Sequence, residues 1–201
     1  MFYLHPHRFN TKRIDALELT KRYNSGKRYF SQVNLTRISL NDLNLADIQL
    51  WRANLAKANL SRSVFRQANI AESNLSGATL WRTDFSYSNL KLALCDRVLS
   101  IRANFSHANL HKSFLKDGDF RLADLTGANL QQADLSGANL SYADLSYADL
   151  RGANLDRAIL TGTKLTNTNL SNTNLDRAIL KEADISPIVS CDRSIVANEI
   201  V

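Results

Sequence analysis

Few residues in this sequence have side chains that could bind a metal ion or act in catalysis, and their spacing does not indicate a site. His107 and His111 are four positions apart, the spacing at which two imidazoles on one face of a helix can bind a metal ion. Asp124, Asp134 and Asp144 could supply the carboxylates that general acid–base catalysis needs. The histidines, however, lie in a stretch without a helical pattern, and the aspartates recur at regular intervals. Neither set therefore indicates a metal or catalytic site.

Other reactive groups give no stronger signal. Cys95 and Cys191 are 96 positions apart and form no metal-binding or redox spacing. The chain has no glycine-rich phosphate loop and no serine in a nucleophile motif. We therefore expect a protein without enzymatic activity, bound metal or cofactor.

Composition and charge describe a single folded domain. The chain has 201 residues, of which 44% are hydrophobic and 22% charged, and its formal charge is +6. The amino terminus lacks a basic region followed by an apolar stretch, so no secretory signal is expected. No run of about 18 apolar residues is present. These features favour a soluble cytoplasmic protein.

A five-residue repeat occupies most of the chain. Every fifth residue from Leu35 to Ile185 gives 31 positions, of which 23 are Leu, four Phe and two Ile. Only Cys95 and Ser100 depart from this rule. Two residues before each such centre, 25 of 31 positions are Ala, Ser or Thr, and one residue before it 21 are Asn or Asp. A repeat this regular predicts a repeat architecture.

The period of five residues fits neither an α-helix nor a flat strand. On a helix, five residues turn through about 500°, and on a strand an odd period sends successive side chains to opposite faces. The chain must therefore bend once per unit to return each centre to one interior. The segment 154–160 recurs at 174–180, and Phe65, Phe85 and Phe105 are also twenty apart. We predict four units per coil.

The Ala-(Asp/Asn)-Leu-x-x units resemble the pentapeptide-repeat family over roughly residues 31–186. This resemblance implies an all-β solenoid, a right-handed four-sided parallel β-helix of about eight coils. It also implies that the centre and the small residue two before it point inward, and that the other three positions point outward. At about 4.8 Å per coil the rod would be about 35–40 Å long.

Residues 1–30 are expected to close the amino-terminal end of the rod with a short helix near residues 16–24. Asp15 and Glu18 have the spacing of a capping box, and Gly26 is placed to end the helix. The first coil carries larger side chains at its four small-residue positions, as suits a coil that meets a cap: Val33, Ile38, Leu43 and Ile48.

The carboxyl-terminal tail, residues 187–201, begins with Pro187, which cannot donate to a ladder and so ends the repeat. The tail is rich in isoleucine and valine. Two alternatives follow: the tail folds over the last coil, or that coil pairs with a second copy of the chain to form a homodimer.

The repeat loses its pattern in the units centred on Cys95 and Ser100, where Val98 replaces a small residue and leucines replace Asn or Asp. If the coil continues there, stacking in twenties brings six apolar side chains together as a mid-rod patch: Trp81, Leu92, Leu94, Leu99, Ile101 and Phe114. Contiguous exposed apolar surface usually marks an interaction site. The alternative is that residues 91–101 leave the coil as a loop and bury these side chains.

A column of three arginines, spaced by twenty residues, is expected along the rod: Arg62, Arg82 and Arg102. Like charges one coil apart repel one another. The column therefore indicates either an anionic partner or a solvated surface relieved by the nearby Asp84 and Glu72.

Charge is uneven along the chain. Residues 1–30 carry +5 and residues 31–116 carry +6, whereas residues 117–185 carry −4. Some members of the resembled family inhibit DNA gyrase because their acidic rods imitate duplex DNA. This rod would be basic over more than half of its length, which disfavours that mechanism. Nucleic-acid binding is not expected either, because the arginines do not alternate with a clear aromatic platform.

The sequence therefore favours a non-catalytic interaction scaffold or regulator that binds another protein through one or two sides of the rod. A DNA-mimicking topoisomerase inhibitor or protection protein is the alternative. The sequence does not name the partner, because the repeat encodes the rod and only its exceptions could encode recognition.

Overall fold

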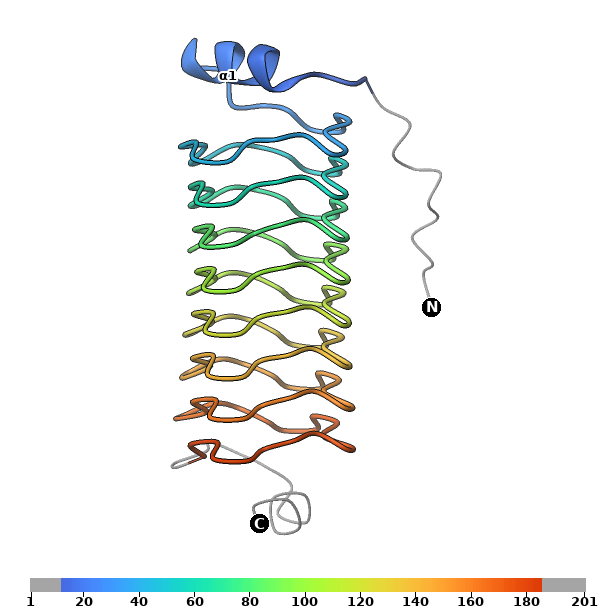
Figure 1. Ribbon diagram of the computed structural model, residues 1–201, viewed down its shortest axis with the longest axis vertical. Coiled ribbons are helices and arrows are strands. Elements are labelled where there is room, and N and C mark those ends of the chain that lie inside the picture. The colour runs from blue at the N-terminus through green and yellow to red at the C-terminus, as the bar shows by residue number, and fades with distance from the viewer. Residues whose placement is uncertain (1–11, 186–201) are drawn as a thin grey trace.

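The chain winds into a β-helix of stacked coils in the computed structural model, which describes residues 12–185 (Figure 1). Isolated parallel bridges connect residues twenty positions apart, from Tyr29–Gln49 to Lys164–Asp184. Nearer the amino terminus, Arg13 forms a parallel bridge with Asn34. One residue per unit is bridged, so a coil is built from very short extended pieces separated by turns.

Each unit bends because it ends in a β-turn. In the unit centred on Leu130, the N–H of Ala133 donates to the carbonyl of Leu130 at 3.0 Å, and Gln132 has a φ of 56°. A positive φ recurs at this turn position in every unit, from Gln32 to Glu182, as the third residue of a type II turn requires. The bend that a period of five demands is therefore made once per unit.

The preference for Asn or Asp has a backbone cause. In the unit 129–133, four of the five backbone N–H groups donate to backbone carbonyls. The fifth, that of Gln131, donates to Oδ1 of Asn129 at 3.1 Å. From Asn34 to Asn174, every Asn or Asp at this position accepts the same bond. The side chain satisfies a donor that the coil ladder leaves unpaired.

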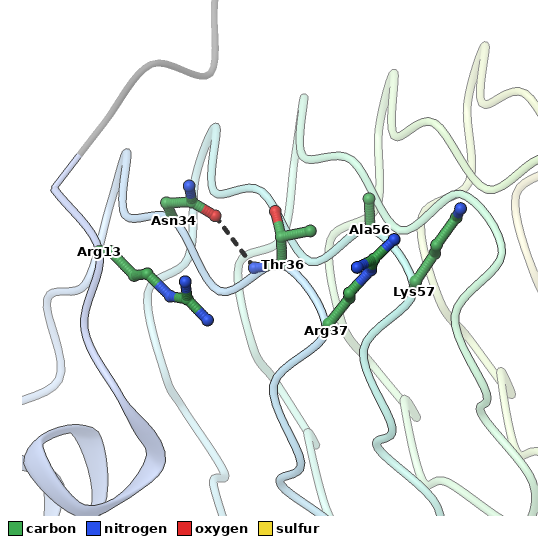
Figure 2. Close-up of a pocket in the computed structure, with 6 residues that line it drawn as sticks. All are labelled: Arg13, Asn34, Thr36, Arg37, Ala56 and Lys57. Carbon is green, nitrogen blue, oxygen red and sulfur yellow. Dashed lines mark hydrogen bonds between the residues drawn. The ribbon is translucent and has the colours of Figure 1, made fainter.

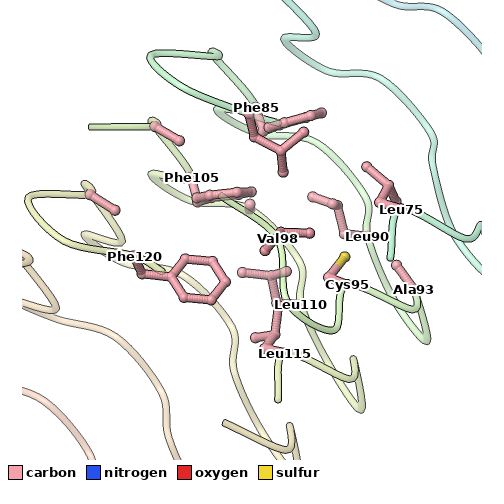
Figure 3. Packing of buried hydrophobic residues seen from close by; sticks show 14 of the residues in the cluster. Leu75, Phe85, Leu90, Ala93, Cys95, Val98, Phe105, Leu110, Leu115 and Phe120 are labelled. Atoms are coloured by element: carbon pink, nitrogen blue, oxygen red, sulfur yellow. The ribbon is translucent and has the colours of Figure 1, made fainter. Parts of the chain in front are cut away.

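The interior is a continuous column of the repeat centres and their small neighbours, which are buried over most of the rod. The rings of Phe65, Phe85 and Phe105 stack with centroids 5.2 and 5.3 Å apart. Such pairs add about 0.5–1.5 kcal/mol beyond the burial of their area. Figure 3 shows this column, with Phe120 turned away from the common plane at 59° to Phe105.

The two irregular units stay in the coil. Leu94 bridges Asn74 below and Phe114 above, and Leu99 bridges Thr79 and Asp119 in the same way. Residues 91–101 therefore do not form a loop.

A compensating exchange explains why the core tolerates these units. Val98 and Ser100 are both buried, so a large side chain occupies the small position and a small one the centre. In the next coil, Phe120 occupies space beside Gly118, where an added Cβ would lie 2.5 Å from the ring. Within residues 12–185, Ser100 Oγ is the buried side-chain polar atom left without a hydrogen-bond partner. Elsewhere buried hydroxyls do find one, as Thr163 does by donating to a backbone carbonyl.

The amino-terminal cap is the helix α1 (Ala16–Asn24), which coincides with the predicted range and lies across the first coil (Figure 1). Asp15 accepts the N–H of Glu18 at 2.8 Å, which satisfies one of the free donors at the helix start. Leu19 is fully buried, and Tyr23 donates its hydroxyl to the carbonyl of Ala46 at 2.8 Å. The helix therefore covers the open end of the core.

The predictions about residues 187–201 lie outside the described part of the chain, so both alternatives for that end remain predictions. Among residues 12–185, no helix is long and apolar enough to cross a membrane.

Candidate protein-binding surface

The predicted mid-rod patch lies on two consecutive sides of the rod. Leu94 and Phe114 are stacked on one side through their bridge, and Leu99 occupies the corresponding position on the next side. Leu99 is 50% exposed and Phe114 36% exposed. These side chains therefore meet solvent at positions where most units carry Asn or Asp.

The other three members of the patch occupy turns. Leu92 precedes the side that holds Leu94, while Ile101 follows the side that holds Leu99, with Trp81 one coil below Ile101. All three turn residues are partly buried. The turn at residues 96–97 lies between the two sides, so the patch consists of two apolar groups with a charged turn between them.

Asp96 in that turn compensates for a change that Phe114 causes. Phenylalanine cannot accept the N–H of Lys116, which an Asn or Asp at its position would take. The carboxylate of Asp96, one coil below, accepts this N–H instead. Partial burial raises the pKa of Asp96, although the hydrogen bond to Lys116 and the charge of Arg97 act in the opposite direction. A partly desolvated carboxylate thus sits between the two apolar groups.

The arginine column is not uniform. Arg62 forms a two-bond pair with Asp42, with Nε–Oδ1 and Nη2–Oδ2 distances of 2.6 Å. This hydrogen bonding lowers the pKa of Asp42 to about 2. Arg82 instead lies over the ring of Trp81, 4.8 Å from its centroid. The first arginine is thus neutralised, and the second contacts the edge of the mid-rod patch.

The carboxylates expected to relieve this column pair elsewhere. Asp84 lies 4.0 Å from Arg66, and Glu72 lies 2.8 Å from Arg52. The ion pair found within the column is that of Arg62 with Asp42, one coil earlier.

His107 and His111 do not act as a pair. They occupy different turns, and the ring of His107 stacks on Tyr87 with centroids 5.0 Å apart. His107 also lies against Gly127, where a Cβ would come within 2.7 Å of Nδ1. Among residues 12–185 no three His, Cys, Asp or Glu side chains gather into a metal-binding group.

Sequence reasoning overlooked a second apolar group on the side that carries Leu99. Ile159 and Ile179 bridge each other in that column, and Ile179 is 51% exposed. The signal was present, since both stand at the position that Asn or Asp usually fills.

Comparison with known proteins agrees with this architecture. The family model for pentapeptide repeats matches eight copies, covering residues 29–67, 44–82, 63–93, 103–141, 119–157 and 158–186. The comparison with curated proteins gives no match.

Two solved structures illustrate the similarity. HetL of the cyanobacterium Nostoc sp. strain PCC 7120, a pentapeptide repeat protein involved in heterocyst differentiation regulation, is 28% identical. The match covers 89% of this chain and 98% of HetL, with a TM-score of 0.50. A trypsin-treated form of QnrB1, a plasmid-mediated fluoroquinolone resistance protein, is 15% identical over 80% of this chain and 84% of its own, with a TM-score of 0.47. The chain belongs to the pentapeptide-repeat family.

Proposed function

We propose that this chain is a non-catalytic scaffold or regulator that binds another protein through the sides of a rigid rod. The rod is a right-handed, four-sided β-helix of about eight coils. The observation that carries the proposal is the exposure of Leu99 and Phe114 on consecutive sides at mid-rod.

These outward substitutions have no folding rationale. An Asn or Asp at these positions accepts a backbone N–H. Leu99 gives that bond up, at a cost of about 1 kcal/mol, whereas the N–H that Phe114 leaves free is accepted by Asp96. Leu99 is half exposed, so it gains little burial in return. An apolar side chain that costs the monomer stability and remains in solvent is best accounted for by a partner that covers it.

The relationship to HetL supports a regulatory role. HetL is similar over nearly its whole length and is involved in the regulation of heterocyst differentiation. A regulator without a reaction centre must act by binding, which a rigid rod with an apolar surface can do.

The test is a double substitution, Leu99→Ser with Ile101→Ser, compared with Ile179→Ser as a matched control. Ile179 lies in the same column as Leu99 and is equally exposed, but it stands four coils away, outside the mid-rod patch. Proteins captured from native lysate by the unaltered chain should be lost with the double variant and kept with the control, while melting temperatures remain similar. Equal capture by all three chains would contradict the proposal.

The alternative, a DNA-mimicking gyrase inhibitor or protection protein, is disfavoured by the positive charge of residues 1–116. QnrB1 shares the fold at an identity too low to carry function. A supercoiling assay separates the two: a concentration-dependent effect of this chain on gyrase would favour the alternative.

A further inference from the structure

A basic pocket lies at the amino-terminal end of the rod, away from the mid-rod patch (Figure 2). Three cationic side chains line it, from the segment before α1 and from the same turn position in two successive coils: Arg13, Arg37 and Lys57. Between them lie Asn34, Thr36 and Ala56. The bridge between Arg13 and Asn34 fixes the segment before α1 against the first coil.

No counter-ion for the three cations is found in the part of the chain that the structure describes. Within residues 12–185 none of them forms a salt bridge, although ten ion pairs occur elsewhere. Asp15, the nearest carboxylate in sequence, accepts the N–H of Glu18 as the helix cap. Residues 1–11 contain no Asp or Glu that could supply one.

The neighbouring columns give no compensation either. In the stack of turns that contains Arg37 and Lys57, the next coil carries Gly77. The first carboxylate in this stack is Asp96, one coil beyond Gly77. The bridged positions on the two adjoining sides are neutral in the first three coils: Asn34, Asn54, Asn74, Ser39, Asn59 and Thr79. Three uncompensated cations around one pocket raise the local potential and favour an anion.

We propose that this pocket binds a phosphate group. Two guanidinium groups offer planar pairs of N–H donors that match the oxygens of phosphate, and the lysine adds a point charge. Arg37 and Lys57 extend side by side from successive coils, and Arg13 comes from the segment before α1 (Figure 2), so an anion between them would meet positive charge on two sides. The Thr36 hydroxyl and the Asn34 amide line the same pocket and can donate further hydrogen bonds.

The test is calorimetric titration of the full chain with inorganic phosphate and, separately, with O-phosphoserine at low ionic strength. We expect Kd values of about 1 mM. Tighter binding of O-phosphoserine would identify a phosphoryl group carried by a partner, and tighter binding of inorganic phosphate a free anion. Either result supports the pocket.

Arg37→Gln should weaken binding by about tenfold, the loss expected for one charge-assisted contact. Arg97→Gln is the matched control, because Arg97 occupies the same turn position three coils away and lies beside Asp96. Glutamine is accommodated at this position, as Gln32 and Gln67 show with positive φ. Equal weakening by both substitutions would indicate general charge attraction and overturn the site. Absence of binding to the unaltered chain, or equally tight binding of citrate, would overturn it too.

Discussion

Replacing Leu135 with aspartate tests the inside-and-outside assignment on which every other conclusion depends. Leu135 is a repeat centre, only 1% exposed, in the regular carboxyl-terminal half of the rod. The change removes a buried side chain that contributes about 1.5–3 kcal/mol. It also places a carboxyl group in a dry interior, where even its neutral form costs about 1–3 kcal/mol without a partner.

The two contributions add to a destabilisation of roughly 2.5–6 kcal/mol. For a chain of this length, 1 kcal/mol shifts the melting temperature by about 2–4 °C, so we expect a fall of between about 5 and 24 °C. Thermal unfolding followed by circular dichroism measures this directly. A fall below about 3 °C would refute the assignment, because it would mean that position 135 can reach water.

The control substitution must be chosen from the structure and not from the repeat. The repeat makes Ser136 an outward position, yet it is only 6% exposed, since a short side chain lies between the longer Lys116 and Asp156 of the adjoining coils. Gln132 is exposed, and its turn position accepts Asp elsewhere, as at Asp117. Gln132→Asp should change stability by less than about 0.5 kcal/mol. Similar melting of the Leu135 and Gln132 variants would show that the core has been wrongly identified.

The pH dependence provides an independent check. Burial favours the neutral form, so the pKa of an aspartate at position 135 is raised in the folded state. Stability is then highest below the unfolded pKa of about 3.9 and is lost as the pH rises through that value toward the folded pKa. The difference in melting temperature from the unaltered chain should therefore widen between pH 4 and pH 7.

Three further predictions follow from the cap, the aromatic column and the mid-rod turn. Deleting residues 1–28 should expose the first coil and cause aggregation, and a monomeric elution profile with unchanged melting would show that α1 is not a cap. Phe85→Ala should cost about 3–5 kcal/mol in denaturant unfolding, because it leaves a cavity between two stacked rings, whereas a cost under about 1 kcal/mol would mean that the column collapses to fill it. Asp96→Asn keeps an acceptor for the Lys116 N–H and removes a carboxylate whose pKa burial raises. This substitution should raise the melting temperature at pH 7. The difference in melting temperature from the unaltered chain should disappear as the pH falls below the ordinary pKa of Asp. A difference that does not depend on pH would refute the proposed role of the Asp96 carboxylate.

Much of the fold could be predicted because the repeat assigns each residue one role. Leu35 to Ile185 recur at one spacing, so the coil register follows from any two coils. The bounds of α1 were also predictable, since Asp15 and Gly26 mark its ends locally. The phenylalanine column followed from the spacing of Phe65, Phe85 and Phe105 alone.

What the sequence did not provide depends on side-chain choice between coils. Arg62 pairs with Asp42 and not with a later carboxylate. The repeat does not predict this pairing, because it does not say toward which neighbouring coil a long side chain turns. Asp96 replaces the acceptor lost at Phe114 across one coil, which no pattern within a unit reveals. The basic pocket joins a residue before the helix to two coil turns, so it exists only once the cap is in place.

The exceptions to the repeat fall into two kinds with different meanings. Val98 and Ser100 are buried, and their exchange of large for small, with Phe120 beside Gly118 above them, preserves a filled interior. Packing accounts for these changes, so they carry no information about recognition. Leu99 and Phe114 point outward and are partly exposed, so packing of the core does not account for them. A search for function in a rod of this kind should therefore separate core exceptions from surface exceptions first, because only the surface exceptions can contact another molecule.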